Sequence, residues 1–589
     1  MVGHGDRLTV ALSTLARPDA APAVASGRAR VVAFWSLAVA VPLLFLGLFF
    51  AWPVAVMISK GFVVDGHLDL SGFADVFSRP RTWRIVGLTI AQATLGTVIS
   101  VGLGVPGAYV LYRHSFRGRA AVRALVTVPF VLPTVVVGVA FRSLLVSGGP
   151  LGFLHLDGTF SAIVAALVYF NYAVVVRAVG GLWERLDPRA EQAARALGAS
   201  PWRAFRTVTL PALTPAIASA ASLTFLYCAT AFGAVLVLGG LRFGTIETEI
   251  WVQTTQFLDL KAAAVLSVVQ LVVVAVVLTV AGRARSRRER ALSLSTAVET
   301  VRPLRLRRPA GMPPGDGHAL TLAATLVTAA VVALLALPLV NLVVRSLQTR
   351  DGVGLDNYTA LGTTGGALTV TVWQATLNSL RVALDATVLA LVVGGLVALV
   401  VSRRPRRPVG RRAVVGLDAL FMLPLGVSAV TVGFGFLLSM HHPFGLPVDL
   451  RTSPVLVPIA QAVVAVPLVV RTVLPVLRAI DPRLREAAAT LGAGPGRVLR
   501  TVDLSIATRS LGLAVGFAFA ASLGEFGATS FLARPDRPTL PVVIFRLIGR
   551  PGAESYGMAL AASVVLAVLT AGIVAACERL RAPGAGGEW

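Results

Sequence analysis

Side chains capable of covalent chemistry are sparse in this chain of 589 residues. Its two lysines, Lys60 and Lys261, do not stand in the Gly-x-x-x-x-Gly-Lys-Ser/Thr spacing of a phosphate-binding loop. No serine lies in a nucleophile elbow, and no group of His, Asp and Glu has metal-ligand spacing. The adjacent His441 and His442 are expected to be a solvated pair. The sequence therefore predicts no catalytic residue, no metal site and no cofactor in this chain.

Acidic side chains beside long apolar runs are the next candidates, because a carboxylate there could attract a cation or contact another protein. Glu525 lies 16 residues beyond Arg509 (509 to 525), which is about 24 Å along one continuous helix. A charge at mid-bilayer costs on the order of 2.5–3.5 kcal/mol, and less toward the surface. We therefore expect Glu525 to face a solute path or to be hydrogen-bonded between helices. Glu247 and Glu249 are expected just outside the membrane, against a docked protein or water.

A short polar segment occurs twice in this otherwise apolar chain. "DPRAEQAARALGA" begins at Asp187, and "DPRLREAAATLGA" begins at Asp481, 294 residues later (187 to 481). Asp followed by Pro is typical of a helix start, and a glycine just beyond a helical run usually ends it. We expect each copy to form a stiff helical elbow, which suits insertion into a partner's groove. The matching residues are Asp187, Pro188, Gln192, Ala193, Ala194 and Gly198 in the first copy and Asp481, Pro482, Glu486, Ala487, Ala488 and Gly492 in the second.

The elements that position these residues are membrane helices. Hydrophobic residues make up 56% of the chain and charged residues only 14%, against roughly 25% charged in soluble proteins. Several runs without a charged residue reach the length of about 20 residues that a helix needs to cross a bilayer. These runs are 31–59, 85–112, 207–241, 262–282 and 555–577, and they contain both cysteines, Cys228 and Cys577. The predicted fold class is therefore all-α, polytopic and membrane-embedded.

Hydropathy predicts about twelve transmembrane helices in two sets of six. The first set is expected at 31–59, 84–112, 122–146, 159–181, 210–239 and 262–282. The second set is expected at 319–345, 372–402, 413–439, 453–477, 508–532 and 555–577. The eighth helix carries Arg381 and Asp385, whose spacing of four places them on one face, where they could neutralise each other.

The two sets are copies of one another. "AFGA" at 231–234 matches "EFGA" at 525–528 at the offset of 294, and Pro129 matches Pro424 at 295. Copies with an even number of spans share one orientation, so we expect a pseudo-twofold axis along the membrane normal with a pathway between the halves. The repeat also favours a paired docking surface over two helix–turn–helix units that pack only on their own bundles.

The net charge of +25 is concentrated in particular loops. Arginines gather at 112–123, 283–290 and 402–412, which follow even-numbered spans. By the positive-inside rule this distribution places those loops and both termini in the cytoplasm. A basic rim against anionic lipid explains the charge, so we expect no nucleic-acid partner.

The pattern D-P-x-x-x-E-A-A-x-x-x-G, followed by nine residues and I-x-L-P, resembles the cytoplasmic-loop motif of bacterial ABC importer permeases. Gln192 replaces the Glu of the motif in the first copy, which ends in "VTLP" at 208–211, and the second copy ends in "VDLS" at 502–505. Two permease halves in one chain are similar to ferric-iron and thiamine importers. "TIETEI" at 245–250 is closer to thiamine permeases, whereas "GEFGAT" at 524–529 is also similar to sulfate and molybdate permeases.

This resemblance implies a type I permease fold, a set of partners and a solute. Two copies of an ABC ATPase, which hold ATP and magnesium, would bind the coupling loops, and an extracytoplasmic solute-binding protein would deliver thiamine or ferric iron. Glu247, Glu249 and Glu525 would lie on the solute path or against the binding protein. The protein would cross the bacterial inner membrane many times. The expected segments are an N-terminal tail (1–30), a first permease half (31–282, coupling loop 183–210), a cytoplasmic linker (283–317), a second half (318–578, coupling loop 478–504) and a C-terminal tail (579–589).

Two other classes of protein stay open at this point. A single-chain secondary transporter driven by an ion gradient can also have six plus six helices and an Arg-rich loop such as "RHSFRGRA" at 113–120. Such a carrier does not need the two matched polar segments. A membrane enzyme would need a cluster of catalytic residues, and the sequence offers none. Neighbouring genes for an ATPase and a secreted binding protein would distinguish an importer from a carrier.

Overall fold

The computed structural model describes residues 21–64, 66–240, 242–289, 304–305, 318–349, 352–364, 368–403 and 408–579. Helices dominate this part, and the described strands form three short pairs. They are β1 (Val63–Val64) with β2 (His67–Leu68), β3 (His114–Ser115) with β4 (Leu304–Arg305), and β5 (Gln348–Thr349) with β6 (Gly352–Val353). Nine described helices are long and apolar enough to cross a membrane, and two bent helix pairs pass the same test together. The predicted all-α polytopic fold is confirmed.

The described residues of the first half form thirteen α-helices. The first span comprises α1 (Ala21–Leu46), the π-helical turn η1 (Gly47–Ala51) and α2 (Trp52–Phe62). The chain continues through α3 (Ser71–Ser78), α4 (Pro80–Ala108), η2 (Tyr109–Arg113), α5 (Arg119–Val131), α6 (Thr134–Leu145), η3 (Gly152–Leu154) and α7 (Phe160–Trp183). It is completed by α8 (Arg189–Ala196), α9 (Pro201–Ala204), η4 (Phe205–Thr209), α10 (Leu210–Ala229), α11 (Gly233–Gly239), α12 (Ile246–Thr255) and α13 (Leu260–Glu289).

The second half repeats much of this order. It begins with α14 (His318–Ser346), α15 (Asp356–Thr359), η5 (Ala360–Gly362), α16 (Val372–Val401), α17 (Pro408–Met422), η6 (Leu423–Gly426) and α18 (Ala429–Ser439). After the short turns η7 (Pro443–Gly445) and η8 (Leu450–Thr452) come α19 (Leu456–Ala479), α20 (Pro482–Thr490), α21 (Pro495–Val498) and η9 (Leu499–Leu504). The last helices are α22 (Ser505–Leu523), α23 (Thr529–Leu532), α24 (Leu540–Ile548) and α25 (Ala553–Arg579).

Four spans that were expected as single helices are broken. The third, expected at 122–146, is α5 and α6 joined at a bend of 105°. Pro133 stands at this break, where it lacks an N–H donor and pushes the preceding residue out of the helical region. The fifth ends at Ala229 and resumes as α11, the ninth is interrupted by η6, and the eleventh ends at Leu523. Irregular backbone at membrane depth is tolerated where it lines a cavity, so these breaks indicate where a cavity should lie.

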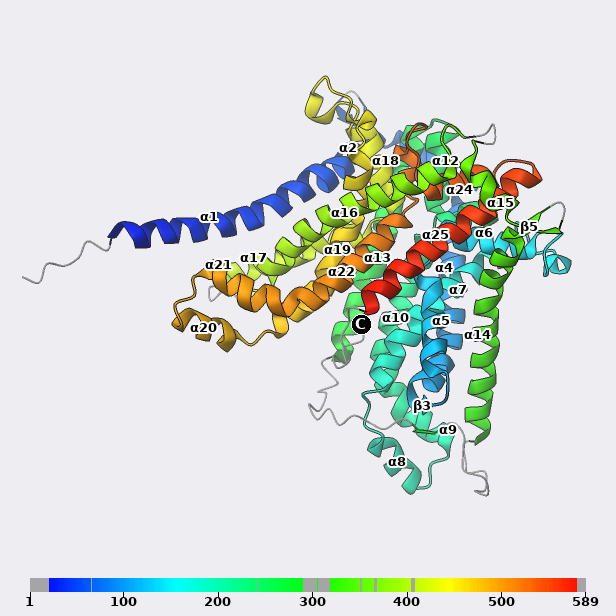
Figure 1. The fold of residues 1–589 in the computed structure, drawn as a ribbon, viewed down its shortest axis with the longest axis horizontal. Coiled ribbons are helices and arrows are strands. Elements are labelled where there is room, and N and C mark those ends of the chain that lie inside the picture. Colours follow the sequence, from blue (N-terminus) through cyan, green and yellow to red (C-terminus); the bar gives the residue numbers. More distant parts are fainter. Residues whose placement is uncertain are drawn as a thin grey trace, which may run out of the picture.

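The first helices of each half pack against helices of the other half. α1 packs against α16 and α2 against α18, whereas α14 packs against α4 and α6. One hydrophobic core therefore contains residues of both halves, such as Met57, Ile250, Leu342 and Ile544. From the end of the molecule that carries α12 and α24, the helices diverge toward α8 in one half and α20 in the other (Figure 1).

Some expected boundaries differ from the structure. α1 begins at Ala21, inside the expected tail 1–30, and α13 continues to Glu289, inside the expected linker 283–317. The rest of the N-terminal tail, most of the linker and the C-terminal tail beyond Arg579 lie outside the described residues. Arg381 and Asp385 are both exposed on α16, and the described contacts include no ion pair between them.

Candidate functional site

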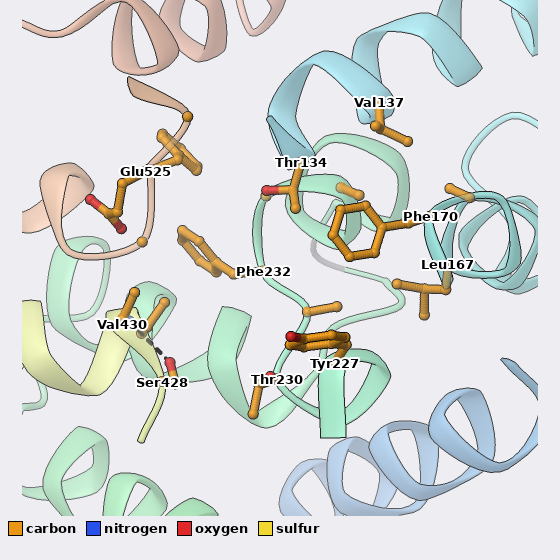
Figure 2. A pocket seen from close by; sticks show the side chains of 18 residues that line it. Thr134, Val137, Leu167, Phe170, Tyr227, Thr230, Phe232, Ser428, Val430 and Glu525 are labelled. Carbon is orange, nitrogen blue, oxygen red and sulfur yellow. Dashed lines mark hydrogen bonds between the residues drawn. The ribbon is translucent and has the colours of Figure 1, made fainter. Parts of the chain in front are cut away.

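A cavity of about 240 Å³ lies between the halves, at the broken spans. It is called the central cavity below. Its lining includes Thr134, Phe170, Tyr227 and Phe232 from the first half and Ser428, Glu525 and Phe526 from the second. In Figure 2, Phe170 and Tyr227 lie on one side of this space and Glu525 on the other, with Phe232 between them.

Two phenylalanines at equivalent positions of the repeat meet at this cavity. Phe232 and Phe526 stack with ring centroids 5.3 Å apart and an interplanar angle of 20°. Each ring follows a broken span and precedes a glycine whose backbone lies against the neighbouring helix. A Cβ added at Gly233 would come within 2.6 Å of the Thr134 hydroxyl, and one at Gly527 within 3.0 Å of the Ala429 Cβ on α18. The glycines therefore allow both loops to bring their rings together between the halves.

Glu525 lies in the turn between α22 and α23. Its carboxylate accepts hydrogen bonds from the backbone N–H groups of Ala528 (2.7 Å) and Thr529 (3.0 Å), and from the Thr529 hydroxyl. The expected position on one continuous helix is wrong, because α22 ends at Leu523, before Glu525. Glu525 thus borders the cavity and is also held by local hydrogen bonds.

Glu247 and Glu249 do not contact water as expected, because both are buried, with 0% and 4% of their surface exposed. Ser428 of the second half donates a hydrogen bond to Glu247 Oε2. Arg81 donates two hydrogen bonds, each 2.9 Å long, to the Glu249 carboxylate. α12 packs against α4, α13 and α18, which removes both acids from the surface. In this structure the two carboxylates connect α12 to neighbouring segments and are not exposed on a surface that another protein could contact.

The two polar segments form matching elbows on the surface. Asp187 and Asp481 each accept a hydrogen bond of 2.9 Å from the backbone N–H two residues later, at the starts of α8 and α20. Gly198 and Gly492 end these helices in the left-handed region, with φ of +87° and +79°. No residue of α8 or α20 is buried. Ala194 and Ala488 are half-buried, and Gln192, Ala193, Glu486 and Ala487 are exposed.

An exposed leucine directly follows α8 and another directly follows α20, and neither is among the site residues expected from the sequence. Leu197 is 89% exposed and Leu491 is 87% exposed, 294 residues apart in the repeat. A single exposed leucine is ordinary on a protein surface. Its repetition at the same position of both elbows makes these two leucines candidates for contact with a partner. The signal was present, because a leucine precedes the glycine in both copies of the polar segment.

Each elbow is braced to the bundle by the same two positions of the repeat. In the first half, the Thr209 hydroxyl donates a hydrogen bond of 2.9 Å to Glu191. At the equivalent positions of the second half, Arg485 Nε donates a hydrogen bond of 2.7 Å to Asp503. Arg403 donates a second one of 2.6 Å to the same carboxylate, whose side chain is only 1% exposed. The brace is therefore a neutral donor and an acid in one elbow and a buried ion pair in the other.

The remaining candidate residues have ordinary surroundings. His441 Nδ1 lies 3.0 Å from Asp449 Oδ2, and His441 is about half exposed. The guanidinium of Arg451 holds the pKa of Asp449 well below its usual range. Cys228 is buried and Cys577 half-buried, and both are free thiols.

Comparisons with known proteins match both halves. The family model described as "Binding-protein-dependent transport system inner membrane component" matches residues 96–290. The thiamine transport system permease protein of Salmonella typhimurium is 30% identical over 477 residues, which cover 79% of this chain and 84% of that protein. Its Escherichia coli counterpart is 28% identical over 506 residues, covering 84% and 89%. The sulfate transport system permease protein of Escherichia coli is 29% identical over 249 residues, covering 41% and 88%.

Proposed function

Because the chain belongs to the family of ABC importer permeases that carry two permease domains in one polypeptide, we propose that it forms the whole translocation pathway for thiamine. The observation that carries the proposal is the central cavity, which broken spans of both halves line together with the stacked Phe232 and Phe526. We choose thiamine as the solute because the similarity to the thiamine permeases extends over both halves. In this arrangement the stacked rings are the closed outer end of the pathway.

ATP hydrolysis takes place on a separate ATPase subunit, which binds ATP and magnesium. One copy docks on each elbow, with Leu197 and Leu491 inserted into its groove, so two copies are needed. This assignment is supported by the absence of buried residues on α8 and α20 and by their equivalence in the repeat. A solute-binding protein delivers thiamine at the opposite end, where α12 and α24 lie (Figure 1). The elbows and both termini lie in the cytoplasm.

The proposal is tested by reconstituting the chain in liposomes with its ATPase and its thiamine-binding protein. We expect uptake of radiolabelled thiamine that needs hydrolysable ATP and the binding protein, and that excess ferric iron or sulfate does not reduce. Liposomes with a non-hydrolysable ATP analogue are the control. Accumulation of thiamine by the chain alone under an ion gradient would show a secondary transporter instead.

A further inference from the structure

The two halves differ where they line the central cavity. The first half contributes a cluster of three aromatic rings. Phe170 and Tyr227 line the cavity, and Phe130 packs against both of them. Phe130 and Phe170 have centroids 5.3 Å apart, and each lies 6.2 Å from Tyr227. The equivalent positions of the repeat hold Leu425, Val464 and Ala521. The aromatic wall is therefore a property of one half and not of the repeated fold.

The acid in this lining comes from the other half. Glu525 occupies the position that Ala231 occupies in the first half, and it is the one charged side chain among the described residues that line the cavity. Its hydrogen bonds to Ala528 and Thr529 hold the carboxylate in place. Arg471 of α19 interacts electrostatically with Tyr227 but does not line the cavity.

Aromatic faces attract cations and also stack on other aromatic rings. Glu525 borders the same space from the opposite side, and its carboxylate is turned into its own loop (Figure 2). Its negative charge therefore favours a cation in the cavity only from behind that loop. A volume of about 240 Å³ lies just below the roughly 300–1,000 Å³ of common small-molecule pockets. We propose that the central cavity is a binding site, within the membrane, for a small cation that carries an aromatic ring. This inference rests on the proposed function and names the residues that would hold the cargo during its passage.

The test replaces each aromatic residue with the one that the second half carries at the equivalent position. Phe170→Val and Tyr227→Ala are expected to weaken equilibrium binding of radiolabelled thiamine to the purified permease–ATPase complex, without binding protein, about tenfold each. Tyr227→Phe keeps the ring and should bind as the wild type does. Glu525→Gln removes the charge and should weaken binding of the cation. Phe34→Val, at an exposed position of α1, is the matched control and should change nothing.

Basal ATPase activity of each variant complex shows that it has assembled. A second probe, the aromatic cation N-methylquinolinium, tests the proposed binding site independently of whether thiamine is the transported solute. If wild-type complex binds this cation and the Phe170 and Tyr227 variants do not, the site is supported even where thiamine is not transported and the proposed cargo fails. If the wild type transports thiamine and both variants bind and transport it unchanged, the site is overturned while the proposed function stands. Absence of binding of either cation to the wild type would also overturn the site.

Discussion

At the scale of single residues, equivalent positions of the repeat make equivalent contacts, but the residue types that make them differ between the halves. The brace of each elbow joins position 191 to 209 or 485 to 503, but the acid stands on the elbow in one half and on the membrane helix in the other. Asp503 is a buried charge with two guanidinium partners, Arg403 and Arg485. Removing one member of a buried ion pair lowers the free energy of unfolding by much more than an exposed ion pair contributes to it, because the remaining charge is left buried without a partner of opposite sign.

Asp503→Thr should therefore loosen the second elbow, with a loss of folding free energy on the order of 3 kcal/mol. The double variant Asp503→Thr with Arg485→Glu places the pair of the first half in the second half, and it should recover most of the loss. The measurement is thiamine uptake per ATP hydrolysed in the reconstituted complex, with thermal unfolding alongside. An equal defect in the single and double variants would show that the brace does not position the elbow.

At the scale of elements, the two elbows have the same construction. Each begins at an Asp-capped helix, ends at a glycine with positive φ, and joins its membrane helix through a π-helical turn, η4 or η9. π-helical turns are rare in proteins, and those that occur often lie at functional sites. Their equivalent placement in the two halves shows that the connection to α10 and α22 is part of the repeated fold, and in the proposed function it carries the movement of each elbow to its membrane helix.

Gly198→Val and Gly492→Val should uncouple ATP hydrolysis from uptake. A β-branched residue at positive φ costs roughly 1–2 kcal/mol, so each helix end would change its angle to escape the strain. Gly494→Ala is the control. Gly494 lies in the second elbow, two residues after Gly492, with φ of −66° and no atom within 4 Å of an added Cβ. We expect hydrolysis to continue while uptake falls severalfold. Normal coupling in the Gly198 and Gly492 double variant would argue strongly against the role of the elbows.

At the scale of the whole molecule, the two halves are joined most closely at one end. The exchanged first helices, the hydrogen bond from Ser428 to Glu247 and the stack of Phe232 on Phe526 all link the halves. Toward the elbows the helices separate (Figure 1). In the proposed function, a movement that brings the elbows together opens the opposite end, and the stacked rings are the closing contact.

Phe232→Ala combined with Phe526→Ala should make the pathway leak. Without the rings, thiamine trapped in liposomes should escape down its gradient in the absence of ATP, several times faster than from wild-type liposomes. Phe153→Ala, at a site 70% exposed in the loop after α6, serves as the control. Retention of thiamine equal to the wild type would place the closing contact elsewhere.

The sequence alone determined the membrane class, the two-half organisation and the positions of the elbows. Each of these follows from local patterns, namely apolar runs long enough to cross a bilayer, a repeat offset of 294, and the Asp-Pro start and glycine end of a short helix. The similarity to thiamine permeases along both halves confirms the predicted family. The same patterns could not separate thiamine from ferric iron, because both are cationic.

Only the tertiary structure decided which polar residues are buried and which residues meet. Glu247 and Glu249 look like surface acids in the sequence, yet α12 packs them against α4 and α18. The broken spans, the stack of Phe232 on Phe526 and the aromatic wall likewise depend on contacts between residues far apart in the chain. Hydropathy averages over a window of residues and registers only how apolar a segment is. It does not register where a helix stops in order to line a cavity, because that is set by the other half of the molecule.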